Sequence, residues 1–376
     1  MSLISYLTRI HFADDVLAEA VNLELSAHKI RRPLIVTDHG VISAGIVQHL
    51  YDALGFGIEH VTFAEVPANP DEGSCRAATE VFREYNCDGL IAIGGGSPID
   101  LAKAVSLMLT HDGPLSSFAA IEGGTARIRK VLPVIAVPTT AGTGSEVGRG
   151  ALIVMDDGRK LGILSPFLIP VAAICDPALT LKLPAGLTAG TGMDALTHCI
   201  ETYISTAYNP PADGIALDGL RRAAANIERA VDHGHDIDAR REMMAAAMNG
   251  ALAFQKGLGG VHAMSHALGS LPGHRLHHGT LNAVLLPHVL EFNAPAVSHR
   301  YGQLREAMRL SPEADLCEVI RKLNSRIGMP SGLAEMGVAE QDIAFAATLA
   351  EQDHTNSTNP RRATRDDYQA IMSNAL

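Results

Sequence analysis

In the first half of the chain, short apolar runs alternate with segments of helical pattern. The apolar runs occupy residues 32–37, 60–66, 89–93 and 131–137, with further candidates at 160–164 and 171–174. Helical patterns fill the intervals at 41–54, 77–85 and 98–109. Unbroken apolar runs are typical of strands buried on both faces, and helical crossovers join parallel strands. The pattern predicts an N-terminal α/β domain with a Rossmann-like parallel sheet.

The second half of the chain has a different pattern of predicted elements. After Pro184 the strand-like runs disappear, and alanine-rich helical segments such as 214–233 and 240–254 take their place. At about 150 residues per domain, a chain of 376 residues has room for two domains. We therefore predict an α/β domain over 1–180 and an all-α domain over 181–376.

The composition excludes several classes of partner. The chain carries 30 Lys and Arg against 41 Asp and Glu, a net charge of −11, so a nucleic acid would be repelled. Its 5 cysteines are scattered without a CxxC motif, which favours a reducing compartment. No apolar run reaches the roughly 18 residues that a membrane span needs, and the N-terminus lacks a signal-peptide pattern. We expect a cytoplasmic protein that acts on a small molecule, without nucleic-acid or membrane partners.

Two glycine-rich loops follow predicted strands. The first, Gly94-Gly95-Gly96-Ser97-Pro98, leads into a helix, with Ser97 placed as its N-cap and Pro98 in its first turn. The second, Thr139-Thr140-Ala141-Gly142-Thr143-Gly144-Ser145, follows the next strong strand. Backbone amides at such a helix start attract phosphate, although a glycine-rich turn without a ligand would look the same. Because both loops follow parallel strands, they predict one nucleotide site.

Asp38 ends the first predicted strand of the sheet. A carboxylate at this position can accept hydrogen bonds from the adenosine ribose and repels a 2′-phosphate, which favours NAD over NADP. The alternative is a turn residue before Gly40. No GxGxxG motif follows this strand, so the usual dinucleotide fingerprint is absent.

Carboxylate and imidazole side chains recur at helical spacing in the second half. Asp194 and His198 stand at i and i+4, and so do His262 and His266. Six of the 17 histidines fall between His262 and His288. One carboxylate with three imidazoles suits a catalytic Fe(II) or Zn(II) ion, whereas the alternative is a set of ordinary packed or exposed histidines.

Five segments in chain order carry a resemblance to a known family. They are GGGSPIDLAKA, PTTAGTGSE, GMDALTHCIE, GLGGVHAMSHALG and HHGTLNAVLLPHV. Together they resemble the iron-containing (group III) alcohol dehydrogenases, relatives of glycerol dehydrogenase and dehydroquinate synthase. The resemblance implies a dehydroquinate synthase-like fold, NAD and Fe(II) or Zn(II) as cofactors, and a homodimer.

The resemblance also implies roles for individual residues. The metal ligands would be Asp194, His198, His262 and His278, and His266 would help to move the proton. The NAD site would comprise Asp38, Gly95, Gly96, Ser97, Asp100, Thr139, Thr140 and Ser145. The segment between His266 and His278 is slightly longer than in the family, so His277 or His274 could replace His278.

The implied reaction is hydride transfer between a primary or small alcohol and its aldehyde. Arg275 and His274 lie beside the predicted metal ligands in the sequence, and a guanidinium there could pair with a substrate carboxylate. This suggests a short hydroxy acid such as 4-hydroxybutyrate, against the alternative of a solvated loop arginine. A metal-independent reductase of the maleylacetate type, a dehydroquinate synthase-like lyase and a non-enzymatic binding module remain as other functions.

Overall fold

The computed structural model describes residues 8–271 and 273–376. These form two compact units. The α/β unit comprises the described residues up to Thr140 together with Gly144–Lys182, and the helical unit comprises Leu183–Leu376 together with Ala141–Thr143. We had placed the domain boundary between residues 180 and 181, and the two units divide between Lys182 and Leu183.

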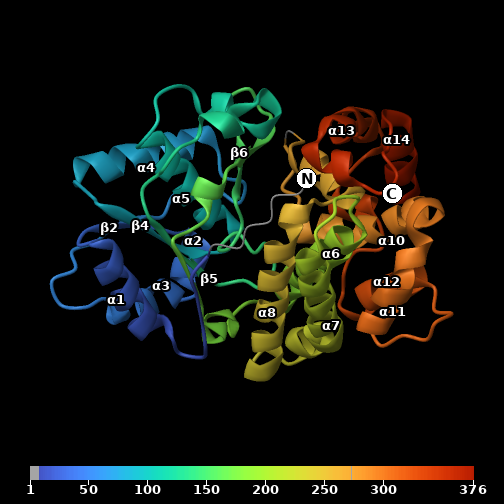
Figure 1. Cartoon of the computed structure of the whole chain (residues 1–376), viewed down its shortest axis with the longest axis horizontal. Helices are drawn as coiled ribbons and strands as arrows, with labels where there is room; N and C mark the ends of the chain where they lie inside the picture. Colours follow the sequence, from blue (N-terminus) through green and yellow to red (C-terminus); the bar gives the residue numbers. More distant parts are fainter. Residues whose placement is uncertain (1–7, 272) are drawn as a thin grey trace. The chain divides into compact units, whose positions relative to one another are not determined.

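The α/β unit contains a six-stranded parallel sheet in the order β1-β8-β5-β4-β2-β3 (Figure 1). Its strands are β1 (Ile10–Phe12), β2 (Pro33–Val36), β3 (Val61–Phe63), β4 (Gly89–Gly94), β5 (Val134–Pro138) and β8 (Ala172–Cys175). In the central pairing, Ile91 of β4 lies opposite Ile135 of β5. The predicted Rossmann-like parallel sheet is confirmed.

Helices pack on both faces of this sheet. Leu90 and Ala92 of β4 belong to a buried apolar cluster with α4 (Glu72–Glu84) and α5 (Gly96–Met108). The intervening Ile91 and Ile93 join a second cluster with α1 (Leu17–His28) and α3 (Ile46–Ala53). Successive residues of a strand point to opposite faces, so a strand that is apolar throughout is buried on both sides.

One local prediction is wrong, and one predicted strand is confirmed but lies outside the main sheet. The single helix expected over 41–54 is broken into α2 (His39–Ser43) and α3, because Gly45 between them adopts a left-handed conformation with φ 72°. The 160–164 segment is a strand, β7 (Lys160–Leu164), but it pairs antiparallel with β6 (Gly150–Val154) in a separate two-stranded sheet. A turn at Gly158, with φ 83°, joins the two strands and makes this local pairing possible.

The carboxyl ends of β2, β4 and β5 bring three loops to one edge of the sheet. β2 lies between β3 and β4, so the chain order reverses beside it. Open α/β sheets bind ligands at such a switch point. Asp38 follows β2, Gly95 follows β4 and Thr139 follows β5. The fold therefore places Asp38, the first glycine-rich loop and Thr139 and Thr140 of the second loop within the α/β unit.

The described residues from 183 onward form helices and connecting loops, with no strand, as predicted. The α-helices are α6 (Ala185–Ile204), α7 (Pro210–Asp232), α8 (Ile237–Ala253), α9 (Gly260–Gly269), α10 (His278–Val297), α11 (Tyr301–Ala307), α12 (Leu316–Arg326), α13 (Glu340–Gln352) and α14 (Arg365–Asn374). Helix α6 is buried over nearly its whole length and packs against α7, α8 and α10. Among the described residues, no helix is long and apolar enough to cross a membrane.

Candidate active site

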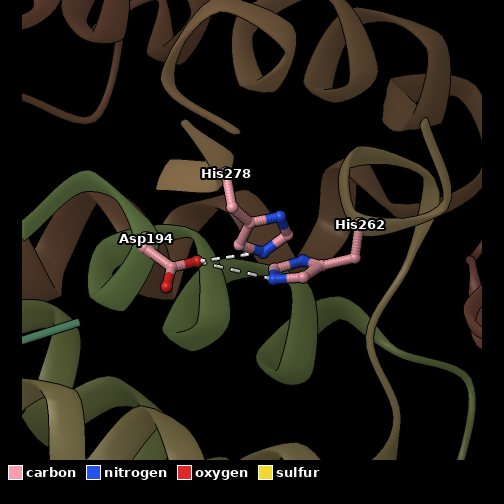
Figure 2. A group of neighbouring side chains, drawn as sticks. All are labelled: Asp194, His262 and His278. Atoms are coloured by element: carbon pink, nitrogen blue, oxygen red, sulfur yellow. Dashed lines mark ion pairs between the residues drawn. The ribbon is translucent and has the colours of Figure 1, made fainter. Parts of the chain in front are cut away.

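Three helices bring one carboxylate and three imidazoles together in the helical unit. Asp194 and His198 stand one turn apart on α6, whereas His262 comes from α9 and His278 from α10. The Nε2 atoms of His198, His262 and His278 lie 3.6, 3.7 and 3.6 Å from Asp194 Oδ1. Figure 2 shows the rings of His262 and His278 directed toward the Asp194 carboxylate. The residues predicted as metal ligands therefore share one location.

The spacing of these atoms suits a metal ion. The ligand atoms of Asp194, His262 and His278 all lie within 4.8 Å of one another. Four ligands placed tetrahedrally at about 2.1 Å from a metal would be about 3.4 Å apart, close to the distances from Asp194 Oδ1. Imidazole nitrogen and carboxylate oxygen are good ligands for Fe(II) and Zn(II). The donor set fits the predicted ion.

Buried partners orient these ligands. Glu201, one turn beyond His198 on α6, accepts a 2.6 Å hydrogen bond from His262 Nδ1 and further bonds from the backbone amides of Gly259 and Val261. Asn282 donates from Nδ2 to Asp194 Oδ1 at 2.7 Å. A carboxylate on the far ring nitrogen fixes the tautomer and leaves Nε2 for a metal.

Electrostatics favour a cation at this location. Burial opposes ionisation of Asp194, but its neighbours His198, His262 and His278 outweigh burial and hold its pKa well below the usual range. Burial lowers the pKa of His198 to about 4, so this ring is neutral at pH 7. Burial opposes a charge on His262, but Asp194 and Glu201 outweigh burial and raise the pKa of this ring to about 9, so a metal ion would displace a proton from it.

The three histidines left open as the last ligand have different surroundings. His277 is the N-cap of α10, and its Nδ1 accepts a 3.3 Å hydrogen bond from the Thr280 amide. His274 Nε2 lies 3.6 Å from Asp342 Oδ2 on α13. Only His278 of the three is among the described residues grouped around Asp194. Arg275, on the same loop, is exposed.

His266 lies one turn beyond His262 on α9. Its Nδ1 is 3.0 Å from Asp353 Oδ2, and its side chain is 7% exposed. The ring stacks on His278 with centroids 5.5 Å apart and planes 10° from parallel. The residue predicted to move the proton is thus beside the ligand group. Asp353 and Glu201 were not predicted as site residues; Glu201 follows Asp194 at i+7, a spacing that places both on one helix face.

The first nucleotide loop differs from the prediction at the start of α5. Gly95, not Ser97, is the N-cap, and Ser97 lies inside the first turn with its hydroxyl donating to the Ala68 carbonyl at 2.6 Å. A Cβ atom on Gly94 would stand 2.6 Å from the Pro98 ring, and its φ of 152° also favours glycine. The helix therefore begins on backbone amides that no capping side chain covers, as a phosphate site requires.

Asp38 is partly buried at the end of β2. Its Oδ1 accepts a 2.9 Å hydrogen bond from the Val41 amide, which makes it the N-cap of α2. Beside it along the sheet edge, the Thr139 amide donates to the Gly94 carbonyl at 2.9 Å and ties the second loop to the first. Thr140 follows, partly buried.

Asp100 and Ser145 hold the two loops together. Asp100 Oδ1 accepts a 2.5 Å bond from Ser145 Oγ, and Oδ2 accepts from the Leu152 amide. The buried Lys103 ammonium donates to the carbonyls of Ser145 and Gly150, both at 2.7 Å. Burial lowers the pKa of Lys103 to about 8. The structure thus gives Asp100 and Ser145 a clear role in positioning the second loop.

Comparisons with known proteins identify the family. The sequence model of "Iron-containing alcohol dehydrogenase" matches residues 8–177, and that of "Fe-containing alcohol dehydrogenase family, C-terminal" matches 188–376. The 4-hydroxybutyrate dehydrogenase of Cupriavidus necator is 52% identical, with 100% of both chains covered. Among solved structures, a 1,3-propanediol oxidoreductase superposes with a TM-score of 0.92 at 35% identity and 100% coverage of both chains.

A third relative has been solved with a nucleotide. The sulfoacetaldehyde reductase of Bifidobacterium kashiwanohense in complex with NAD⁺ gives a TM-score of 0.88 at 28% identity, covering 100% of this chain and 98% of that one. The two family models together span both units of the chain, and they match in the order expected from the five sequence segments. The chain belongs to the iron-containing alcohol dehydrogenase family.

Proposed function

We propose that this NAD-linked, iron-containing alcohol dehydrogenase interconverts 4-hydroxybutyrate and its semialdehyde. The convergence of three imidazole nitrogens on Asp194 Oδ1 supports oxidation of an alcohol. The choice of substrate is supported by the relative named 4-hydroxybutyrate dehydrogenase, which matches over the full length.

We assign the metal to Asp194, His198, His262 and His278. Iron bound by these residues supplies a Lewis acid for the substrate oxygen, and NAD supplies the hydride acceptor. Glu201 keeps the Nε2 atom of His262 directed toward Asp194. Zinc is an alternative occupant, since the same ligands bind it well.

His266 accepts the hydroxyl proton in this scheme. Its Nδ1 donates a hydrogen bond to the Asp353 carboxylate, so Nε2 is the nitrogen that carries the lone pair. Imidazole is the side chain that most often serves as a general base in enzymes. Its ring stacks on the proposed ligand His278 and so lies beside the proposed metal ligands.

We assign the NAD site to the loops at the carboxyl edge of the sheet. Gly95, Gly96 and Ser97 begin α5 and would hold the pyrophosphate at the helix N-terminus. Thr139 and Thr140 would contact the nicotinamide ribose, and Asp38 the adenosine ribose. Asp100 and Ser145 contribute by fixing the second loop.

The substrate carboxylate is assigned to the loop between α9 and α10. Arg275 is exposed there, and its guanidinium would pair with the carboxylate; His274 lies on the same loop beside Asp342. This loop connects α9 to α10, and both helices carry proposed metal ligands.

One set of kinetic measurements tests the function and the substrate separately. Reduction of NAD by 4-hydroxybutyrate and by 1-butanol is measured in the wild type, Asp194→Ala and Arg275→Ala. We expect Asp194→Ala to abolish both activities, and Arg275→Ala to raise KM for 4-hydroxybutyrate by about tenfold, equivalent to about 1.4 kcal/mol, while leaving 1-butanol unchanged. Full activity of Asp194→Ala would contradict the metal-dependent reaction. Equal effects of Arg275→Ala on both alcohols would contradict recognition of the carboxylate by Arg275, but not the metal-dependent reaction.

We further propose that the protein works in the cytoplasm as a homodimer. All 5 cysteines are unpaired, and Cys75, Cys87, Cys175 and Cys199 are buried, as suits a reducing compartment. The dimer is supported by the family resemblance. Light scattering on the purified protein would measure the oligomeric state.

A further inference from the structure

Asp353 is the carboxylate partner of His266, although it belongs to none of the motifs in the sequence. It lies between α13 and a short 3-10 helix, His354–Thr358, and its Oδ2 is 3.0 Å from His266 Nδ1. The two residues are 87 positions apart. Both side chains are largely buried, 7% exposed for His266 and 14% for Asp353.

The Asp353 carboxylate is itself held in place. Its Oδ1 accepts hydrogen bonds from the Thr355 amide at 2.8 Å and from the Thr355 hydroxyl at 2.6 Å, which caps the 3-10 helix. Burial alone would raise the pKa of Asp353, but His266 and Thr355 outweigh it and hold the pKa well below the usual range. Asp353 therefore presents a fixed acceptor, Oδ2, to the His266 ring.

The plane of the His266 ring is also restricted. His278 stacks on it with ring centroids 5.5 Å apart, and His354 lies nearly parallel to it, with centroids 6.0 Å apart and planes 14° from parallel. Two orientations of the imidazole share this plane, and they are related by a 180° rotation about the Cβ–Cγ bond. An acceptor beside Nδ1 selects one of the two orientations and the tautomer with the proton on Nδ1.

Helix α9 uses the same arrangement twice. One turn before His266, His262 donates from Nδ1 to Glu201 at 2.6 Å, and its Nε2 faces Asp194. Both histidines thus carry a carboxylate on Nδ1, supplied by a segment distant in sequence. In each case the arrangement leaves the Nε2 lone pair available. At His262 this lone pair would bind a metal ion, and at His266 it would accept a proton.

We propose that Asp353 is a positioning residue for His266, which fixes its orientation and its Nδ1-protonated tautomer so that Nε2 accepts the alcohol proton. This rests on the role of His266 in the proposed function. The proton leaves the hydroxyl for Nε2 as the hydride leaves the carbinol carbon for NAD, so the imidazole becomes an imidazolium. The fixed carboxylate beside Nδ1 stabilises that positive charge.

The test uses Asp353→Asn, His266→Ala and the double variant. Asparagine keeps the size of the side chain and an acceptor for Thr355, but its amide can donate to Nδ1 and so stabilise the wrong tautomer. We expect kcat for alcohol oxidation to fall by roughly 10²- to 10⁴-fold in Asp353→Asn, with KM, iron content and the dissociation constant for NADH within twofold of the wild type. Because the two residues act as a unit, the double variant should be no slower than His266→Ala.

Two further variants separate positioning from folding. Asp353→Glu retains the charge and should recover at least part of the lost kcat. Asp238→Asn removes an exposed aspartate at the start of α8 and should match the wild type in every measurement. A wild-type kcat in Asp353→Asn with a slow His266→Ala would overturn the inference but leave the proposed function intact. The inference would also be overturned if the two losses in kcat multiplied in the double variant, or if Asp353→Asn lost activity because it bound iron or NADH more weakly. A fully active His266→Ala would overturn both.

Discussion

At the scale of single residues, the histidines differ in the partner of their Nδ1 atom. His262 and His266 donate from Nδ1 to Glu201 and Asp353, so each keeps an Nε2 lone pair. His277 instead uses its Nδ1 to accept from the Thr280 amide as the cap of α10. Two adjacent histidines, His277 and His278, therefore have different contacts: His277 caps α10, and His278 faces Asp194.

Asp38 provides a prediction about cofactor choice. Asp38→Asn removes the negative charge that would repel a 2′-phosphate, while asparagine still caps α2 through the Val41 amide. We expect the preference for NAD over NADP, measured as the ratio of kcat/KM values, to fall by about tenfold, equivalent to about 1.4 kcal/mol. The stability should be unchanged.

The control for this prediction is another aspartate cap in the same unit. Asp71 caps α4 by accepting from the Ser74 amide, and it lies away from the loops after β2, β4 and β5 in the sequence. Asp71→Asn should leave the cofactor ratio as in the wild type. An Asp38→Asn enzyme with the wild-type ratio would show that Asp38 acts as a cap only.

Two pairs of side chains around Asp194 could be predicted from spacing, and their buried partners could not. Asp194 and His198 share one face of α6, as do His262 and His266 on α9, because i and i+4 lie one turn apart. Nothing in local sequence relates either pair to Asp353. That residue reaches His266 only because α13 packs against α9 and ends beside it. Contacts of this kind depend on tertiary packing, which periodicity does not encode.

At the scale of elements, the start of α10 approaches α6 unusually closely. A Cβ atom on Gly279 would stand 2.1 Å from the Gly190 carbonyl oxygen and 3.2 Å from Asp194 Cβ. Backbone atoms cannot give way as a flexible side chain can. Glycine at position 279 therefore allows the first turn of α10 to bring His278 to Asp194.

Gly279→Ala tests this packing. The methyl group should push the first turn of α10 away from α6 and separate His278 from Asp194, so we expect the affinity for Fe(II) or Zn(II) to fall by at least about tenfold, in the range seen when the support of a metal ligand is lost. Competition with a chelator measures it.

Gly302→Ala on α11 is the matched control. A Cβ there would have no atom within 4 Å, so the variant should bind metal normally and be stabilised by roughly 0.5–1 kcal/mol as an alanine within a helix. If Gly279→Ala bound metal as tightly as Gly302→Ala, the close approach would not control the ligand geometry.

Elements were predictable where their burial was uniform. β4 and β5 are apolar throughout and were recognised as strands. β6 was not predicted, although its partner β7 was, and the two strands pair outside the main sheet. The break between α2 and α3 depends on one backbone conformation at Gly45, which glycine permits but does not require.

At the scale of the whole molecule, the change from alternating strands and helices to helices alone reflects two separate cores. In the α/β unit the apolar clusters lie on the two faces of one sheet. In the helical unit α6 is buried among other helices and supplies two of the four proposed metal ligands. Strand order could not be derived from the sequence, because equally apolar strands can be arranged in several orders.

This division predicts a localised response to metal removal. The proposed ligands come from α6, α9 and α10, and folding brings these three helices together. An ion that binds all of the ligands therefore stabilises the folded form of that unit. An ion present at 100 times its dissociation constant contributes about 2.7 kcal/mol. For a unit of this size, its removal should lower Tm by about 5–10 °C.

Hydrogen exchange measured by mass spectrometry shows where that stability is lost. After chelation, we expect faster exchange in α6, α9 and α10 and unchanged exchange in β2, β4 and β5, with Fe(II) or Zn(II) restoring protection. Asp194→Ala should already exchange rapidly in the three helices and should not respond to chelator. Equal acceleration in β4 and α6 would contradict the localised response, because it would mean that the ion stabilises both cores rather than the three helices that carry its ligands.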